Sequence, residues 1–245
     1  MGTAIVVTSG KGGTGKTSIT GGVAGSLARL GHSVLCIDMD IGLRNLDISL
    51  GLSDRALMDF SDVAEGRCPL VRAAVNHPDL PGLALLTAPM TLSPALTEEA
   101  VRRMLDTARS LYDYVLIDSP AGLGAGFRMA CCGADRAVVV STTDASALRD
   151  AQRTVAVLRG RIPRIHLVVN RVQPKLLRRL HTTIDDAMDT AGLPLLGVVP
   201  EDPQVMLSAN LGRPLILGGR QGAANACLNI AKRLEGRRVP IMRIR

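Results

Sequence analysis

Short apolar runs alternate with longer amphipathic segments along the whole chain. Runs of about 4–8 apolar residues are typical of buried strands, whereas apolar positions spaced three and four apart predict helices. Strands are predicted over residues 4–7, 33–38, 83–87, 114–118, 137–140, 165–169 and 195–199. Helices are predicted over residues 18–30, 97–110, 145–158, 176–191 and 223–234. Repeated strand–helix units predict an α/β fold, with a mostly parallel twisted sheet and helices on both faces.

The same pattern predicts one domain. A chain of 245 residues can bury one large core, and no repeat, low-complexity segment or linker separates a second domain. We therefore expect one domain over residues 1–235 and a short basic tail over residues 236–245, in which Pro240 interrupts any helix. Since the chain has neither a signal peptide nor a run of about 18 apolar residues, we expect a cytoplasmic protein.

A glycine-rich loop follows the first predicted strand and opens the first predicted helix. Residues 10–17 satisfy the pattern G-x-x-x-x-G-K-[ST] in full. In such a loop, backbone N–H groups and the helix N-terminus converge on phosphate groups, a lysine reaches the β- and γ-phosphates, and the following hydroxyl ligates Mg²⁺. The lysine and hydroxyl here are Lys16 and Thr17. The predicted nucleotide-binding residues of this loop are Gly10, Lys11, Gly12, Gly13, Thr14, Gly15, Lys16, Thr17 and Ser18.

Two other predicted strands also end in carboxylates. Asp118 closes one of them, and Asp38 and Asp40 close the other. The carboxyl ends of parallel strands lie at one edge of a sheet, so these side chains are expected near the glycine loop. We interpret Asp118 as the acid that holds Mg²⁺ directly or through water, Asp38 as a residue that supports the metal, and Asp40 as the residue that orients the attacking water.

Composition draws attention to a second lysine. Only four of the 29 basic residues are lysines, and two of them, Lys11 and Lys16, lie in the glycine loop. Lys11 has no part in the ordinary phosphate-loop pattern. The net charge of +7 permits anionic partners, although two Tyr, two Phe and no Trp argue against stacking on single-stranded nucleic acid. The five cysteines include no C-x-x-C pair, which favours reduced thiols.

Residues 11–17 resemble the deviant Walker A box of the MinD/ParA ATPases, in which Lys11 takes the place of the signature lysine. Residues 37–47 resemble switch I, and more closely that of the MinD members than that of others. Residues 118–122 resemble switch II, and residues 198–202 resemble the nucleotide-base loop. The resemblance extends from residue 1 to about residue 234, and it implies a P-loop NTPase fold.

The resemblance also implies a mechanism. It implies ATP and Mg²⁺ as cofactors, hydrolysis of ATP, and an ATP-dependent homodimer in which Lys11 reaches the phosphates held by the other subunit. Lys11, Lys16 and Asp40 would then be the catalytic residues, and Thr17, Asp38 and Asp118 the metal-site residues. The base loop would contribute Pro200, Glu201 and Asp202. Asn170 would contact adenine, although an Asn after a strand is also a common turn residue.

The implied role is placement of the division septum, with MinC- and MinE-like partners meeting the helix over residues 145–158. MinD members usually end in an amphipathic membrane helix, which this tail does not resemble. Its four arginines could instead give weak contact with an anionic membrane, so a peripheral location on the cell membrane is expected, unless the tail is simply a frayed end.

Three alternatives stay open at this point. A ParA-like partitioning ATPase would bind DNA nonspecifically and would account for the positive charge; no sequence-specific nucleic-acid binding is expected. A flagellar-number ATPase of the same family would differ chiefly in its partners. An iron–sulfur protein of the same fold would have to use Cys131 and Cys132, but adjacent residues on a helix point in different directions and no C-x-x-C supports them.

Overall fold

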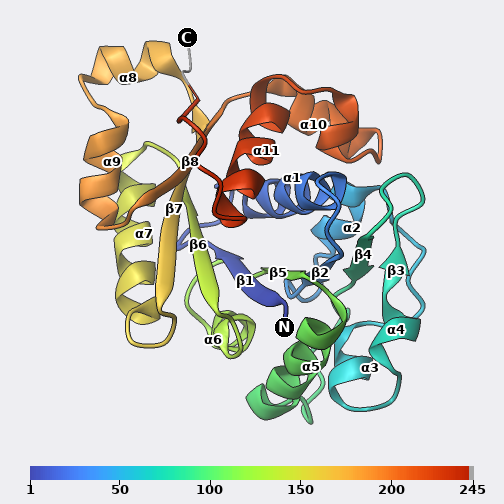
Figure 1. Cartoon of the computed structure of the whole chain (residues 1–245). Helices are drawn as coiled ribbons and strands as arrows, with labels where there is room; N and C mark the ends of the chain where they lie inside the picture. Colours follow the sequence, from blue (N-terminus) through green and yellow to red (C-terminus); the bar gives the residue numbers. More distant parts are fainter. Residues whose placement is uncertain (243–245) are drawn as a thin grey trace.

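The computed structural model describes residues 1–242 of the chain. Within them, eight strands form one sheet in the order β3-β4-β2-β5-β1-β6-β7-β8 (Figure 1). The strands are β1 (Thr3–Thr8), β2 (Val34–Asp38), β3 (Val75–Asn76), β4 (Leu83–Leu86), β5 (Tyr114–Asp118), β6 (Arg136–Ser141), β7 (Arg164–Val172) and β8 (Leu195–Pro200). Neighbouring strands are parallel except for the short β3, which pairs antiparallel with β4. The prediction of a mostly parallel sheet is therefore confirmed.

Helices cover both faces of the sheet, and each face has its own aliphatic core (Figure 1). One core lies under α1 (Lys16–Arg29), α2 (Asn45–Leu50), the 3₁₀ turn η1 (Leu215–Gly218) and α11 (Gly222–Leu234). The other lies under α3 (Phe60–Ala64), α4 (Leu70–Ala73), α5 (Glu98–Leu111), α6 (Ala125–Cys131), α7 (Ala145–Leu158) and α9 (Ile184–Ala191). Both phenylalanines, Phe60 and Phe127, are fully buried in this second core. The sequence pattern predicted α1, α5, α7 and α11 to within about two residues at each end.

One predicted helix is wrong. Residues 176–191 form two helices, α8 (Pro174–Leu180) and α9, because His181 takes a left-handed conformation with φ 51° and ends the first. Thr183 then starts the second through a capping box with Asp186. Helices α2, α3, α4, α6 and α10 (Pro203–Asn210) were not predicted, since each is at most eight residues long and shows little periodicity.

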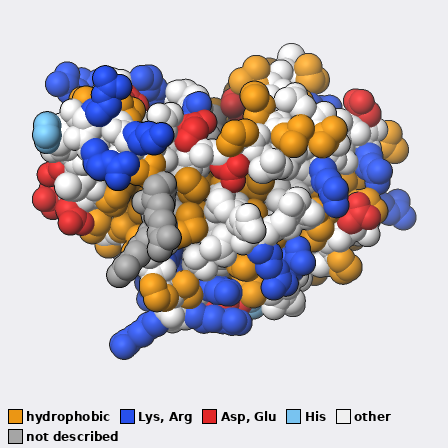
Figure 2. All heavy atoms as spheres, turned by 90° about the horizontal axis from the view of Figure 1, so that it is seen from above, with side chains coloured by type: hydrophobic (Ala, Val, Ile, Leu, Met, Phe, Trp, Pro, Cys, Tyr) orange, Lys and Arg blue, Asp and Glu red, His pale blue; other side chains and the backbone are white. Residues whose placement is uncertain are grey.

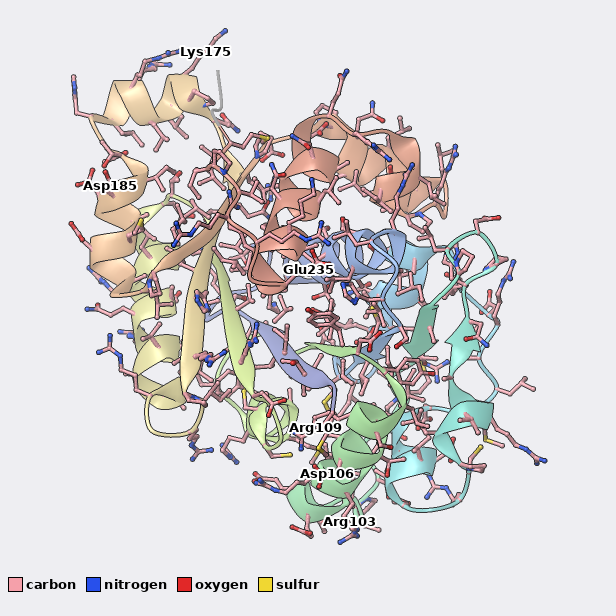
Figure 3. All side chains as sticks on the ribbon, in the orientation of Figure 1. Arg103, Asp106, Arg109, Lys175, Asp185 and Glu235 are labelled. Atoms are coloured by element: carbon pink, nitrogen blue, oxygen red, sulfur yellow. The ribbon has the colours of Figure 1, made fainter. Side chains whose placement is uncertain are left out.

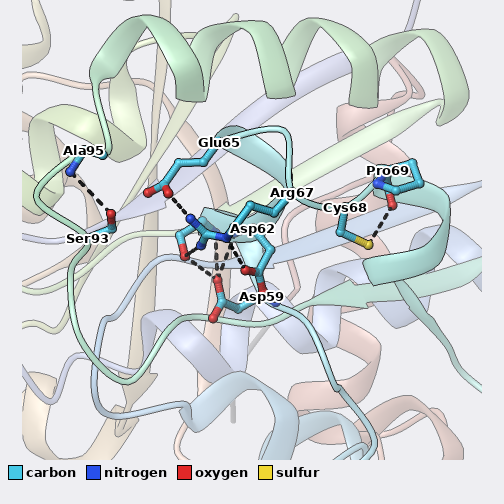
Figure 4. A network of polar contacts seen from close by, with 9 residues as sticks. Asp59, Asp62, Glu65, Arg67, Cys68, Pro69, Ser93 and Ala95 are labelled. Atoms are coloured by element: carbon cyan, nitrogen blue, oxygen red, sulfur yellow. Dashed lines mark hydrogen bonds and ion pairs between the residues drawn. The ribbon is translucent and has the colours of Figure 1, made fainter.

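The start of α3 illustrates how a short helix is fixed by polar contacts rather than by periodicity (Figure 4). The Asp59 carboxylate accepts hydrogen bonds from the N–H groups of Ser61 and Asp62, and the Asp62 carboxylate accepts one from the Asp59 N–H. Arg67 Nε donates to Asp62 Oδ1 at 2.8 Å, and the same guanidinium contacts Glu65. This network fixes residues 59–67 within the connection between β2 and β3.

The chain turns back after α11. The Arg233 guanidinium donates to the carbonyl groups of Val239 and Pro240 at 3.0 and 2.7 Å, so this part of the predicted tail lies against the helix. The sulfur of Met242 is 3.6 Å from Asn225 Nδ2, near the other end of α11. Residues 243–245 of the predicted tail lie outside the described residues. Among residues 1–242, no helix combines the length and apolar composition needed to cross a membrane.

Candidate functional site

The glycine loop connects β1 to α1, and its backbone needs glycine at defined positions. Gly13 and Gly15 have φ values of 80° and 89°, in the left-handed region that favours glycine. Gly10 has a different constraint: a Cβ at this position would lie 2.2 Å from the Asp150 carbonyl oxygen of α7. The loop is therefore packed against α7 at its start and curled over the N-terminus of α1 at its end.

A pocket of about 810 Å³ opens beside this loop. Lys16 lines it and is only 8% exposed. Burial lowers the pKa of this ammonium, while the nearby Asp118 and Asp40 carboxylates oppose the shift. A buried cation of this kind is stabilised by anionic partners, and phosphate oxygens would supply them. The other lining residues from the loop are Gly12, Gly13, Gly15, Thr17 and Ser18.

Asp118 lies at the end of β5, directly beneath the first turn of α1. Its carboxylate accepts hydrogen bonds from the hydroxyl groups of Thr17 at 2.7 Å and Thr20 at 3.1 Å. Burial raises the pKa of the Asp118 carboxyl to about 7, and the hydrogen bond from Thr17 only partly offsets this. Asp38 is its neighbour in the β2–β5 register.

Asp38 uses both carboxylate oxygens to hold the backbone that follows β2. It accepts hydrogen bonds from the Asp40 N–H at 2.9 Å and from the Leu46 N–H at 3.1 Å. Burial raises the pKa of the Asp38 carboxyl to about 6. Asp38 thus shapes the loop over residues 39–45 and the start of α2. Asp40 itself lines the pocket, where burial raises the pKa of its carboxyl and Lys16 opposes the rise.

The donor set beside Lys16 suits Mg²⁺. Mg²⁺ prefers oxygen ligands and in nucleotide sites takes one or two protein groups together with phosphates and water. The Thr17 hydroxyl and the Asp118 carboxylate, 2.7 Å apart, are groups of this kind. Within residues 1–242, no cluster of three or more His, Cys, Asp or Glu side chains could hold a metal alone. The Thr17 and Asp118 oxygens therefore fit Mg²⁺.

Lys11 points away from the pocket in this structure. Its Nζ donates to the Ser146 hydroxyl at 2.8 Å and lies 3.8 Å from Asp144 Oδ1. Asp144 is the N-cap of α7 and also accepts a hydrogen bond from the Ala147 N–H. The Lys11 side chain is 48% exposed, so the ammonium is held at the surface by the first turn of α7.

The opposite end of the pocket is formed where β7 and β8 end. Asn170 is buried, and its side-chain amide donates to the Thr14 carbonyl at 2.8 Å, which ties β7 to the glycine loop. Pro200, Glu201 and Asp202 all line the pocket. Glu201 forms an ion pair with Arg171 at 2.8 Å. Asp202 caps α10 through the Gln204 N–H and also accepts a hydrogen bond from the Ala223 N–H at the start of α11.

Comparison with known proteins places this geometry in a family. Residues 5–215 match the family model of the CobQ/CobB/MinD/ParA nucleotide binding domain. The chain belongs to this family. It is 40% identical to the septum site-determining protein MinD of Synechocystis over 97% of its own length and 91% of the relative's. The nucleotide-binding fold of the MinD/ParA proteins is therefore the fold of this chain.

Two solved structures agree with this assignment. The chain matches a chain of the MinC:MinD cell division protein complex of Aquifex aeolicus with a TM-score of 0.92 and 36% identity, over 98% of both chains. It matches the septum site-determining protein MinD of Pyrococcus horikoshii, complexed with Mg-ADP, with a TM-score of 0.84 and 26% identity over 96% of both chains.

Within this MinD/ParA site, sequence reasoning missed several residues. Thr20 follows Lys16 by one helical turn, and this spacing could have placed it on the same face of α1 as the glycine loop. Arg171 directly follows Asn170 and could have been considered with it. Ser146 and Asp144 carry no local signal for contact with Lys11, because the contact spans 135 residues of sequence. The sequence also did not predict the apolar wall of the pocket, which includes Leu43, Ile48, Val205 and Met206.

Proposed function

We propose that this chain is an ATP-hydrolysing dimerisation switch that acts in placing the division septum. The observation that carries the proposal is the 40% identity to a septum site-determining MinD along nearly the whole chain, in a protein whose glycine loop contains both Lys11 and Lys16. We assign the switch to one domain over residues 1–235, with residues 236–245 as a short basic tail.

Nucleotide binding is assigned to the pocket beside the glycine loop. Its backbone N–H groups and the buried Lys16 ammonium bind the β- and γ-phosphates, and Ser18 supports the first turn of α1. Pro200, Glu201 and Asp202 border the base, while Asn170 acts by fixing the Thr14 carbonyl and by offering its side-chain amide oxygen to the base. Burial raises the pKa of Asp118 and lowers the pKa of Lys16, and shifted pKa values of this kind cluster at functional sites.

We assign hydrolysis to groups that position the attacking water and neutralise phosphate charge. No side chain is assigned a covalent role. Thr17 and Asp118 would hold Mg²⁺, which neutralises charge on the phosphates when it is bound. Asp40 faces the same pocket as Lys16 and orients water toward the γ-phosphate. Asp38 keeps Asp40 in place, since its carboxylate accepts the Asp40 N–H. Lys16 and the loop N–H groups stabilise the negative charge that develops on the transferred phosphoryl group.

Dimerisation gives Lys11 its role. In the single chain Lys11 lies on Ser146 and Asp144, both exposed enough to exchange it for a stronger anion. A second subunit with bound ATP presents that anion, because phosphate oxygens carry more negative charge than the hydroxyl and carboxylate that hold Lys11. ATP therefore assembles the homodimer, and hydrolysis removes part of the phosphate charge that attracts Lys11.

The partners proposed are MinC- and MinE-like proteins, with α7 as their contact. The Aquifex match is to a protein complex that contains MinC, and α7 is the helix whose first turn holds Lys11. We place the protein in the cytoplasm and, through basic residues of the tail, peripherally on anionic membrane. Of those residues, Arg237 pairs with Glu235, which lowers its contribution.

The test is capture of a partner by the ATP-locked protein. Asp40→Ala protein, loaded with ATP, should retain a purified MinC-like protein from the same organism, whereas the ADP-loaded protein should release it. Equal retention with ATP and with ADP would reject the switch. Retention of duplex DNA in place of the MinC-like protein would favour a partitioning ATPase.

A further inference from the structure

The Asp118 carboxylate is held by hydroxyl groups, unlike the carboxylates that pair with arginines elsewhere in the chain. In Figure 3, Asp106 lies beside Arg109 on α5, with which it forms an ion pair. Figure 2 shows further Lys and Arg side chains at the surface of the molecule. Asp118 is only 1% exposed, and within the part of the chain that the structure describes it forms no ion pair. The orientation of its carboxylate therefore depends on Thr17 and Thr20, whose hydroxyl groups donate to it.

Strand pairing fixes the backbone of Asp118 on both sides. In the register of the sheet it is the partner of Val7 on β1 and of Asp38 on β2. The freedom that remains is rotation of the carboxylate about its side-chain bonds. Thr17 donates to Asp118 Oδ2 at 2.7 Å and Thr20 donates to Oδ1 at 3.1 Å, so each hydroxyl holds one oxygen. Because Thr17 and Asp118 are the groups that fit Mg²⁺, Thr20 is the donor that lies outside the metal set.

Thr20 has two acceptors within reach of its single hydroxyl proton. Its side chain is fully buried, and its Oγ1 lies 3.0 Å from the Lys16 carbonyl oxygen as well as 3.1 Å from Asp118 Oδ1. A hydroxyl group donates only one proton at a time. The Lys16 carbonyl already accepts the Thr20 N–H in the ladder of α1, whereas Asp118 Oδ1 has no other donor among the described residues. Since a buried carboxylate oxygen without a donor is costly, we assign the hydroxyl proton to Asp118.

We propose that Thr20 is a positioning residue for Mg²⁺: its hydroxyl holds Asp118 Oδ1 and thereby sets how the Asp118 carboxylate and the Thr17 hydroxyl meet the metal. This role rests on the proposed function, which places Mg²⁺ at Thr17 and Asp118. The alternative is packing alone, because a buried helical hydroxyl can bond simply to the carbonyl four residues earlier. Ser26 of α1 is such a case. It is fully buried, it donates to the Gly22 carbonyl at 2.7 Å, and no carboxylate accepts from it among the described residues.

The test measures ADP binding in EDTA and then Mg²⁺ binding to the ADP complex, both by calorimetry with the full chain. ADP keeps the proposed ATP-dependent dimerisation out of the measurement. Thr20→Val and Thr20→Ala remove the hydroxyl, with and without a methyl group in its place. In both variants the dissociation constant of Mg²⁺ should rise by about tenfold or more, because loss of an outer partner of a metal ligand typically lowers metal affinity roughly 10- to 100-fold. ADP affinity in EDTA should be unchanged, since the glycine-loop N–H groups and Lys16 are retained.

Ser26→Ala is the matched control, because it removes a buried hydroxyl of the same helix that bonds only to a backbone carbonyl. Ser26→Ala, and Thr20→Ser, which keeps the hydroxyl, should bind Mg²⁺ as tightly as the unmodified chain. Circular dichroism and thermal unfolding verify that each variant is folded.

Unchanged Mg²⁺ affinity in Thr20→Val and Thr20→Ala would overturn the role of Thr20 alone. The same conclusion would follow if Ser26→Ala weakened Mg²⁺ binding equally, or if the loss appeared only in ADP affinity in EDTA. A different failure would concern the proposed function. If the unmodified chain bound ADP without binding Mg²⁺, the metal site at Thr17 and Asp118 would be rejected together with the role of Thr20, and absence of ADP binding would reject the nucleotide site as well.

Discussion

Replacing Asp118 with asparagine should stabilise the nucleotide-free protein above neutral pH. The Asp118 carboxyl has a pKa of about 7 in the fold against 3.8 ordinarily. Between these values the folded state keeps a proton that the unfolded state has lost, so the free energy of unfolding falls as pH rises. At roughly 1.4 kcal/mol per pKa unit, the fall due to Asp118 is about 3 kcal/mol between roughly pH 5 and pH 8.

The Asp118→Asn substitution removes that titration but keeps most of the shape of the side chain. The variant loses one of the hydrogen bonds from Thr17 and Thr20, which costs about 1 kcal/mol at every pH. It should therefore be slightly less stable than the unmodified chain at about pH 5 and about 2 kcal/mol more stable at about pH 8. Asp38, with a pKa of about 6, titrates over part of the same range, and its negative charge contributes to the raised pKa of Asp118.

Urea unfolding at both pH values, without nucleotide or Mg²⁺, measures this difference directly. Comparison of the two proteins also removes the effect of His77 and His166, whose pKa values are lowered by burial. If the stability gap between the two proteins is the same at both pH values, the Asp118 carboxyl does not have the raised pKa on which this prediction rests. The same Asp118→Asn variant should lose Mg²⁺-dependent hydrolysis of ATP.

Three further substitutions test other parts of the site. Lys16→Ala should weaken ATP binding by at least about 100-fold in calorimetry, since a buried charged hydrogen bond contributes roughly 3 kcal/mol, and unchanged affinity would refute its phosphate role. Asp40→Ala should still bind ATP and dimerise but should lose hydrolysis, measured by phosphate release; normal turnover would show that another group orients water. Asp144→Asn keeps the cap of α7 but removes the charge near Lys11, so about half the ATP should suffice for dimerisation, because an exposed pair contributes roughly 0.5 kcal/mol. An increased ATP requirement would contradict the view that Asp144 retains Lys11.

The sheet and the phosphate loop could be predicted from the sequence because both depend on local pattern. Buried parallel strands such as β1 and β5 are continuous apolar runs, and the glycine loop has fixed spacing. The break at His181 carried no such signal, since one residue in a left-handed conformation ends α8 without Gly or Pro. Periodicity continued across it, which produced a single predicted helix.

The hydrogen-bond partners of the site residues were harder to predict than the location of these residues near the site. The sequence placed Lys11, Asp38 and Asn170 near the site, but not the Lys11 contact with Ser146, the two backbone hydrogen bonds of Asp38, or the Asn170 bond to Thr14. Each of these depends on which elements the fold brings together. The same holds for the tail. The sequence predicted its basic character, but not that Arg233 of α11 would contact the carbonyl groups of Val239 and Pro240. Those contacts depend on the turn that follows α11.

The mass of the ATP-bound protein tests the proposed switch most directly. Asp40→Ala protein in ATP should scatter light as a species of about twice the 25.8 kDa chain mass, because ATP is retained and each Lys11 can reach the other subunit's phosphates. Asp40→Ala/Lys11→Ala protein should bind ATP equally well and remain at the mass of one chain. Two chains in both proteins, or one chain in both, would contradict a dimer assembled by Lys11 and ATP.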